Sequence, residues 1–227
     1  MRRATVDVAG MAFVADHAGA LFEETAGLLI VADLHLEKGS AYAARRVLLP
    51  PYDTAATLAK LCHLVLRYRP RAIAALGDSF HDRRAGERIQ RADRETIAQL
   101  QRGRDWLWIA GNHDPESPKG LGGEAHREIR FGSLTLRHEP RLGVAFGEIA
   151  GHLHPVARVA SSRGHLRRRC FVGDGSRCVM PAFGAYAGGL NLRDAAFAPL
   201  FLGPAFTAHV LGRDRVYAVA PGRCIAD

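Results

Sequence analysis

The sequence predicts an α/β fold whose second half consists mostly of β-strands. In the first half, short apolar runs end at polar clusters and alternate with amphipathic helices, which is the pattern of strands and helices in an α/β sheet. From Ile129 onward the apolar residues alternate in short segments instead. The chain shows no linker, repeat or low-complexity tract, so we expect one domain over residues 1–227.

Three buried strands are predicted in the first half, because each is an uninterrupted apolar run. They cover residues 27–32, 72–76 and 106–110, and they end at Asp33, at Gly77-Asp78 and at Gly111-Asn112-His113-Asp114. Ligands of open α/β sheets bind at the carboxyl ends of the strands. The polar residues that follow these strands are therefore candidate site residues.

Two amphipathic helices are predicted between these strands. The first has apolar residues at the i, i+3, i+4 and i+7 spacing of one helix face, namely Leu58, Leu61, Cys62 and Val65. Asp53 is its predicted N-cap and Pro70 its stop signal. The second is a charged helix over residues 87–102 with a weaker apolar stripe, formed by Ile89, Ile97 and Leu100.

The second half alternates in the manner of half-buried strands. Its first segment contains Ile129, Phe131, Leu134 and Leu136, with one slip at Gly132-Ser133, and further strands are expected up to Val219. Residues 195–212 form the longest uncharged run, but its prolines and glycines suit a lipid-facing helix poorly, so we expect a buried loop and strand. With no targeting segment, we expect a soluble cytoplasmic protein.

The composition is that of a globular protein with a polyanionic partner. Hydrophobic residues make up 48% of the chain and charged residues 24%, which supplies a substantial core. Lys and Arg number 31 against 23 Asp and Glu, a net charge of +8 that favours a polyanion. The 4 cysteines form no C-x-x-C pair, which indicates a reducing compartment and argues against a zinc ribbon.

Five polar clusters carry residues that bind metal ions. They are Asp33-Leu34-His35, Gly77-Asp78 with His81-Asp82, Gly111-Asn112-His113-Asp114, His138-Glu139-Pro140 and Gly151-His152-Leu153-His154. Residues i and i+2 of an extended strand point to the same side, so we expect Asp33 to converge with His35, and His152 with His154. Imidazole, carboxylate and amide donors without thiolate suit Mn²⁺, Fe or Zn²⁺ in an open catalytic site. With two such ions and only two carboxylates, the site keeps a charge of about +2 for hydroxide and phosphate.

The ordered blocks D-x-H, G-D-x-x-H-D, G-N-H-D, H and G-H-x-H resemble the calcineurin-like metallophosphoesterase superfamily. Longer strings are similar to the bacterial ligase-associated DNA-damage-response endonuclease family, at residues 31–39, 49–53 and 181–186 and at Gly188-Gly189. His81-Asp82, in place of the Asp-Arg of many members, fits the DNA-nuclease branch, as does His138-Glu139-Pro140. The resemblance implies a four-layer α/β/β/α sandwich of two mixed sheets, with a dimetal site at the strand ends.

The resemblance also implies a role for each site residue. Asp33, His35 and His154 would hold one divalent ion, Asn112, His138 and His152 a second, and Asp78 would bridge both. Mn²⁺ is the expected metal, with Zn²⁺, Fe and Ni²⁺ as alternatives. His113 would face the scissile phosphate as the catalytic group, with Asp114 orienting its imidazole. His81, Arg83 and Arg45 are candidates for orienting a ligand or contacting a phosphate.

The function implied is a Mn²⁺-dependent DNA endonuclease of DNA repair, which hydrolyses phosphodiesters by a metal-bridged hydroxide. Its partners would be DNA, including single strands, and an ATP-dependent DNA ligase, a helicase and an exonuclease; a homodimer is compatible with the sequence, and no membrane partner is expected. Two alternatives stay open. The same core serves a phosphomonoesterase or small-nucleotide phosphohydrolase, and the chain could be a non-catalytic subunit of a DNA-repair complex.

Two further motifs have more than one interpretation. Arg167, Arg168 and Arg169 fit either a contact with a phosphate backbone or a solvated strand end. The glycines of residues 184–189 resemble a phosphate cradle, but no Lys-Ser/Thr follows them, so we interpret the segment as a tight turn shared with the family.

Overall fold

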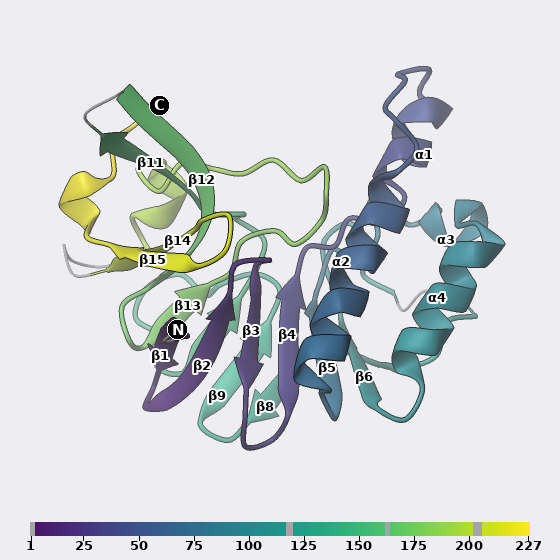
Figure 1. Ribbon diagram of the computed structural model, residues 1–227, viewed down its shortest axis with the longest axis horizontal. Coiled ribbons are helices and arrows are strands. Elements are labelled where there is room, and N and C mark those ends of the chain that lie inside the picture. The colour runs from purple at the N-terminus through teal and green to yellow at the C-terminus, as the bar shows by residue number, and fades with distance from the viewer. Residues whose placement is uncertain (1–2, 117–119, 162–163, 202–205) are drawn as a thin grey trace.

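Two β-sheets pack against each other, and helices cover the outer face of the first sheet (Figure 1). The computed structural model describes residues 3–116, 120–161, 164–201 and 206–227. Among these residues, no helix combines the length and the apolar run needed to cross a membrane.

The first sheet contains 7 strands, ordered along the sheet as they occur in the sequence. They are β1 (Thr5–Val8), β2 (Met11–Asp16), β3 (Ala20–Glu23), β4 (Leu28–Ala32), β5 (Ala72–Leu76), β6 (Asp105–Ile109) and β7 (Glu124–His126). Strands β1 to β4 pair antiparallel, and β4 to β7 pair parallel. The three strands predicted from apolar runs are confirmed as β4, β5 and β6. Because they are parallel, the polar clusters that follow them lie along one edge of the sheet.

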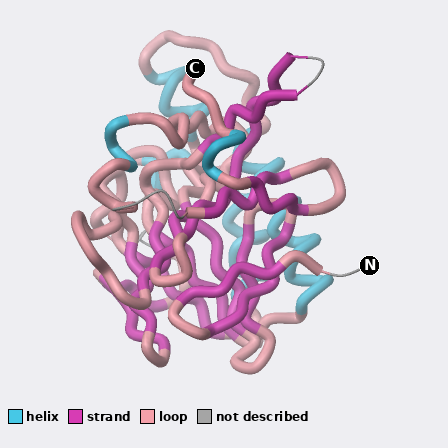
Figure 2. The backbone as a smooth tube through the Cα atoms, turned by 90° about the vertical axis from the view of Figure 1, so that its left-hand side faces the viewer, coloured by secondary structure: helices cyan, strands magenta, loops and turns pink. Residues whose placement is uncertain are grey.

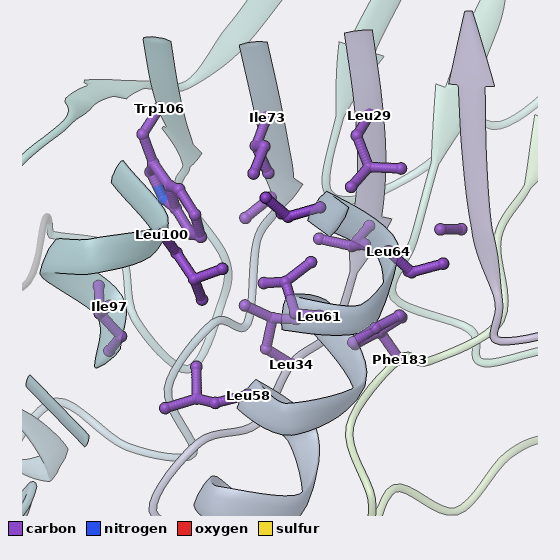
Figure 3. Packing of buried hydrophobic residues seen from close by; sticks show 14 of the residues in the cluster. Leu29, Leu34, Leu58, Leu61, Leu64, Ile73, Ile97, Leu100, Trp106 and Phe183 are labelled. Atoms are coloured by element: carbon purple, nitrogen blue, oxygen red, sulfur yellow. The ribbon is translucent and has the colours of Figure 1, made fainter. Parts of the chain in front are cut away.

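Helices α1 (Lys38–Ala44), α2 (Asp53–Tyr68), α3 (Ala85–Arg88) and α4 (Arg91–Gln101) complete the first half. The predicted apolar face of α2 packs on the sheet, where Leu61 and Leu64 lie between the helix and strands β4 and β5 (Figure 3). Burying side chains of this size stabilises a fold by roughly 1.5–3 kcal/mol each. The helix is thereby fixed over the strands whose ends carry the polar clusters.

Two details of the helices differ from the prediction. The single helix expected over residues 87–102 is divided, because Ile89 is buried in the core with an extended backbone (φ −56°, ψ 129°) between α3 and α4. Asp53 is the first residue of α2 rather than its N-cap, which is Tyr52. The carboxylate of Asp53 accepts instead from the backbone N–H of Gly39 in α1, at 3.1 Å.

The second sheet contains 8 strands and confirms the predicted β-rich second half. Its order is β15 (Val216–Val219), β14 (Thr207–Leu211), β12 (Gly164–Gly173), β13 (Arg177–Val179), β10 (Glu148–Ala150), β9 (Leu134–Arg137) and β8 (Glu128–Phe131). Strand β11 (Val156–Ser161) pairs with β12, and the two extend as a ribbon beyond the sheets (Figure 2). The slip at Gly132-Ser133 is the turn between β8 and β9.

Three apolar clusters divide the molecule into four layers. One lies between the helices and the first sheet, one between the two sheets, and one on the outer face of the second sheet. The last is covered by Phe197 of the 3-10 helix η1 (Ala195–Phe197) and by Leu200 and Phe201; a second 3-10 helix, η2 (Pro221–Arg223), lies near the C-terminus. The predicted sandwich is confirmed, and its fourth layer, within the described ranges, consists of loop and 3-10 helix. Residues 202–205 of the predicted loop and strand lie outside those ranges.

Candidate metal centre

The seven predicted ligand residues lie together where the two sheets meet. Loops after strands of the first sheet supply Asp33, His35, Asp78 and Asn112, and loops after β9 and β10 of the second sheet supply His138, His152 and His154. Strands β9 and β10 are parallel, so their carboxyl ends also point the same way. Five segments far apart in the sequence therefore contribute to one site.

The first group of donors contains Asp33, His35 and His154. The Nε2 atoms of His35 and His154 are 3.3 Å apart, and Nε2 of His154 is 3.4 Å from Oδ1 of Asp33. One donor atom from each of these side chains lies within 4.8 Å of the others. This is the spacing of side chains that can share one metal ion.

The second group contains Asn112, His138 and His152. Oδ1 of Asn112 lies 2.8 Å from Nε2 of His138 and 3.1 Å from Nδ1 of His152. The two imidazole nitrogens are 3.1 Å apart. Three donor atoms thus converge on one small volume.

Two carboxylates connect the groups. Oδ2 of Asp78 is 4.0 Å from Nε2 of His35, and its Oδ1 is 3.5 Å from Nε2 of His138, so one oxygen faces each group. Asp33 is near both groups in a different way: its Oδ1 lies 3.4 Å from Nε2 of His154, but its contact with His138, at 3.6 Å, is to Nδ1, the ring nitrogen that faces the Leu76 carbonyl. Both carboxylates are buried, and Asp78, the predicted bridging residue, directs one oxygen toward a donor nitrogen of each group.

The ligands do not converge through an extended strand, as the sequence argument expected. Strand β4 ends at Ala32, and the backbone is left-handed at Asp33 (φ 54°) and at His35 (φ 44°). His152 and His154 have the same conformation, with φ of 71° and 47°. Nine described residues other than glycine have positive φ, and five of them are predicted ligands, since Asp78 also belongs to this set. Such a backbone costs about 1–3 kcal/mol per residue and is typical of functional sites.

The donor set fits metal ions because lone pairs face one another in it. When Nδ1–H of His138 donates to the carbonyl oxygen of Leu76, at 3.1 Å, Nε2 of the neutral ring carries a lone pair. That lone pair points at the Oδ1 atom of Asn112, which is itself an acceptor. A cation bound by both atoms turns this repulsion into coordination, and nitrogen and oxygen donors of this kind suit Mn²⁺, Fe, Ni²⁺ and Zn²⁺.

Burial favours the neutral form of two imidazoles of the site, those of His35 and His152. It lowers the pKa of His35 to about 2, assisted by the neighbouring His154, His81 and His113 rings. Burial also lowers the pKa of His152, with a further contribution from His138. Since a neutral ring nitrogen binds metal and a protonated one does not, these rings are ready to act as ligands at neutral pH.

The comparisons with known proteins agree with this site. A family model described as calcineurin-like phosphoesterase matches residues 27–177, a range that contains all seven predicted ligands. The chain belongs to the calcineurin-like phosphoesterase family. It is a metal-dependent phosphoesterase, as predicted.

Solved structures resemble the phosphoesterase over most of its length. The crystal structure of Pseudomonas putida nuclease MPE superposes with a TM-score of 0.71 and 26% identity, covering 96% of this chain and 100% of that one. A phosphoesterase from E. coli, Yfce, shares 14% identity with a TM-score of 0.40, over 85% of this chain and 98% of that one. No curated protein matches the sequence significantly.

His113 lies at the edge of the centre, where it faces both the donors and solvent. Its Nε2 is 3.9 Å from Oδ2 of Asp78, and its side chain is 40% exposed. Its other ring nitrogen, Nδ1, pairs with the carbonyl oxygen of His81 at 2.8 Å. The backbone N–H of His113 donates to Oδ1 of Asp78, and this hydrogen bond fixes the position of His113 relative to the carboxylate.

Asp114 does not contact the His113 ring, contrary to the sequence interpretation. Its Oδ2 accepts from the backbone N–H of Phe80 at 3.0 Å, and its Oδ1 is buried without a hydrogen-bond partner. Burial raises the pKa of Asp114 to about 7, although the Phe80 N–H opposes this shift. The carbonyl of His81 takes the orienting role instead, so His81 acts through its backbone.

Other candidates lie around the rim. The His81 ring stacks on His113, with ring centroids 5.4 Å apart, and burial lowers the pKa of His81 to about 4. Arg45 and Arg83 are exposed, and within the described part of the chain neither forms an ion pair.

The loop of residues 181–189 supports the site, a role that the sequence interpretation as a turn did not include. The Gly184 N–H donates to the carbonyl oxygen of Asp33 at 3.0 Å. A Cβ at Gly184 would lie 2.3 Å from the carbonyl oxygen of Leu34, and one at Gly189 would lie 2.3 Å from that of His154. Only glycine lets this loop approach both ligand segments so closely.

Arg169 of strand β12 holds the same loop. Its guanidinium donates to the carbonyl oxygens of Ala182 and Ala187 at 2.9 Å each, and to that of Ala185 at 3.4 Å. Arg167 donates to the carbonyl oxygen of Gly189 at 2.8 Å. Two members of the arginine triplet thus bind backbone carbonyls of the supporting loop, an outcome that neither sequence interpretation contained.

Proposed function

We propose that this phosphoesterase is a Mn²⁺-dependent phosphodiesterase that cleaves DNA internally. The observation that supports it most directly is the position of His113, whose exposed ring stands beside a cluster of metal donors. A phosphate arriving from solvent would meet the ring and the donors together. The resemblance to a protein described as a nuclease supports DNA as the substrate.

When bound, the two ions supply a water molecule acidified to a pKa near ~7 and neutralise the charge of the phosphate oxygens. The contribution of the protein is to place them and to manage the leaving group. With Nδ1–H directed at the His81 carbonyl, a protonated His113 ring presents Nε2–H to the phosphate. It then stabilises the developing charge or donates a proton to the leaving alkoxide.

The residues around the centre favour a diester over a monoester. A monoester dianion is commonly clamped by guanidinium groups through paired hydrogen bonds. A diester needs less compensation of charge, and two ions with one imidazolium supply it.

The test is an assay on matched substrates. The protein is incubated with bis-(p-nitrophenyl) phosphate, p-nitrophenyl phosphate and circular single-stranded DNA, in Mn²⁺, Zn²⁺, Ni²⁺ or Mg²⁺, with Asp78→Ala as control. We expect diester hydrolysis and opening of the circle, greatest in Mn²⁺ and lost in the control. A preference for the monoester would support the phosphomonoesterase alternative, and DNA binding without cleavage in any metal would support a non-catalytic subunit.

A cytoplasmic DNA-repair role is part of the same proposal. It rests on the family resemblance, which also suggests an ATP-dependent DNA ligase, a helicase and an exonuclease as partners. Co-purification of these enzymes with the tagged protein from its native cells, before and after DNA damage, tests this role. Size measurement in solution tests whether the protein forms a homodimer.

A further inference from the structure

A basic and apolar segment projects from the fold beside the metal centre. Residues 38–52, the protruding segment, comprise helix α1 and the chain that leads to α2, and Figure 1 shows them extending beyond the rest of the molecule. The segment contains Lys38, Arg45 and Arg46 and not one Asp or Glu. Its positive charge is therefore not compensated from within.

The tip of the protruding segment exposes large apolar side chains. At the tip Leu48 is 88% exposed and Val47 49%, and at the base Tyr52, next to Asp53, is 68% exposed. Arg45 and Arg46 beside them are also exposed, and neither forms an ion pair within the described ranges. Apolar side chains gathered at a projecting tip indicate an interaction site, and the adjacent cations indicate an anionic partner.

The base of the protruding segment is anchored to the fold. The Gly39 N–H donates to Asp53 of helix α2, and the Arg88 guanidinium of α3 donates to Oγ of Ser40 at 3.0 Å. Arg88 is itself paired with Asp82 at 2.8 Å. These contacts come from two different helices, so the segment is presented in a fixed direction.

A row of aromatic rings connects the protruding segment with the centre. The Tyr42 ring of α1 lies 5.7 Å from the His81 ring, which lies 5.4 Å from that of His113. The His113 ring is 5.4 Å from that of His35, one of the predicted ligands. A chain bound along the tip can therefore continue to a phosphate at the metal ions.

We propose that the protruding segment binds single-stranded nucleic acid on one side of the phosphate to be cleaved. The arginines contact the backbone phosphates, and Leu48 and Tyr52 pack against the bases, the combination of cations and apolar surface that holds single strands. This inference rests on the proposed function and adds to it. It names the surface that binds the polymer outside the metal centre, which a small diester at the metal ions does not reach.

The test compares a polymer with a small diester in matched variants. The double variant Arg46→Ala/Leu48→Ala removes one cation and one apolar side chain from the protruding segment. The control Leu66→Ala/Arg102→Ala removes the same two types from the C-terminal parts of α2 and α4, at the opposite ends of these elements from the site. Cleavage of single-stranded DNA and of bis-(p-nitrophenyl) phosphate is measured for all three proteins over a range of salt concentrations.

For the protruding-segment variant we expect kcat/KM on single-stranded DNA to fall about tenfold or more, with the small diester within about twofold of wild type. The slope of log binding constant against log salt should fall by about 0.7, because the variant has one cation fewer to neutralise a phosphate of the single strand. The control variant should match wild type on both substrates.

Each other outcome is decisive. If the kcat/KM of the variant equals that of wild type on both substrates, the inference is wrong while the proposed function stands. Equal losses of kcat/KM on both substrates would mean that the segment only positions the metal-binding residues and does not bind the polymer. If the segment binds anionic phosphatidylserine vesicles and not DNA, its partner is a membrane surface. If wild type cleaves neither substrate, the proposed function itself fails.

Discussion

Oδ1 of Asn112 lies 2.8 Å from Nε2 of His138, so two atoms that carry lone pairs face each other across the metal centre. The contact is held from both sides, because His138 is fixed by the Leu76 carbonyl and Asn112 follows strand β6. Without a cation this pair is unfavourable, since neither atom supplies a proton when the ring is neutral. The stability of the fold should therefore depend on bound metal.

We expect removal of divalent ions by a chelator to lower the thermal unfolding midpoint, and added Mn²⁺ to restore it. An ion at about 100 times its dissociation constant stabilises the folded state by about 2.7 kcal/mol. Metal analysis should find two ions per wild-type chain and neither in Asp78→Ala, because one oxygen of Asp78 faces each donor group. If neither chelator nor Mn²⁺ changed the thermal unfolding midpoint, the prediction that these residues bind metal ions would be wrong.

Replacing His113 with alanine should leave metal content unchanged and lower turnover on a diester by about 10²–10⁴-fold. The ring faces the centre without being one of the metal donors, so the substitution should lower turnover without lowering metal content. Metal analysis and kcat of the same preparation check this. Wild-type turnover in His113→Ala would show that the ring has no part in the reaction.

Gly184→Ala should weaken metal binding, because the new methyl group would lie 2.3 Å from the carbonyl oxygen of Leu34 and displace the segment that carries Asp33 and His35. Overpacking of this kind costs about 1–3 kcal/mol. Gly188→Ala is the matched control, since a Cβ there meets no atom within 4 Å. Isothermal titration with Mn²⁺ should show about tenfold weaker binding for the first variant and unchanged binding for the second. Equal affinities would show that the loop does not support the site.

The stability of the fold should rise with pH above neutrality through Lys60. Burial lowers the pKa of Lys60 to about 7, and the nearby Arg169 lowers it further. The unfolded chain keeps the proton up to its ordinary pKa of about 10.4, so between these values unfolding takes up a proton. The contribution of Lys60 to stability therefore increases across this window, by at most about 1.4 kcal/mol per pH unit. The buried thiols of Cys170 and Cys178, whose pKa values burial raises, act in the opposite direction above their ordinary pKa of about 8.5.

Lys60→Met should flatten this dependence. The comparison is best made between about pH 7 and 8, below the ordinary pKa of the buried Cys170 and Cys178 thiols and of Tyr68. Burial raises the pKa of these groups, so their effect on stability at higher pH has the opposite sign. Denaturant unfolding of both proteins at several pH values measures it. Parallel curves would show that Lys60 does not titrate in this range.

Local patterns in the sequence predicted the strands and the positions of the ligands well. The continuous apolar run of residues 72–76, which is followed by Gly77 and Asp78, predicts a buried strand from its own residues. The structure has β5 over the same residues. The same holds for the helical spacing of Leu58 and Leu61. Features decided by neighbours within a few residues were therefore accessible.

Features decided by distant parts of the chain were not. The left-handed backbone at Asp33 depends on the loop of residues 181–189 that packs against it. Arg169 binds carbonyls 13 to 18 residues away, and the His113 ring is oriented by a carbonyl 32 residues before it. Ile89 lies between two helices in an extended conformation, and its side chain is buried in the core. Spacing rules cannot reveal such contacts, since they arise only once the sheets have come together.

The division of the donors between two sheets has a consequence for variation elsewhere in the protein. Asp33 and Asp78 follow strands of one sheet and His138 follows a strand of the other, so a metal site formed by these residues would depend on how the two sheets sit against each other. Phe13 and Phe171 are among the largest side chains buried in the cluster between the two sheets. A substitution in this cluster that shifted one sheet by a fraction of an ångström relative to the other would move the metal-binding residues of the two sheets apart without altering any of them. Catalysis in this enzyme should therefore depend on buried apolar side chains that lie away from the ligands.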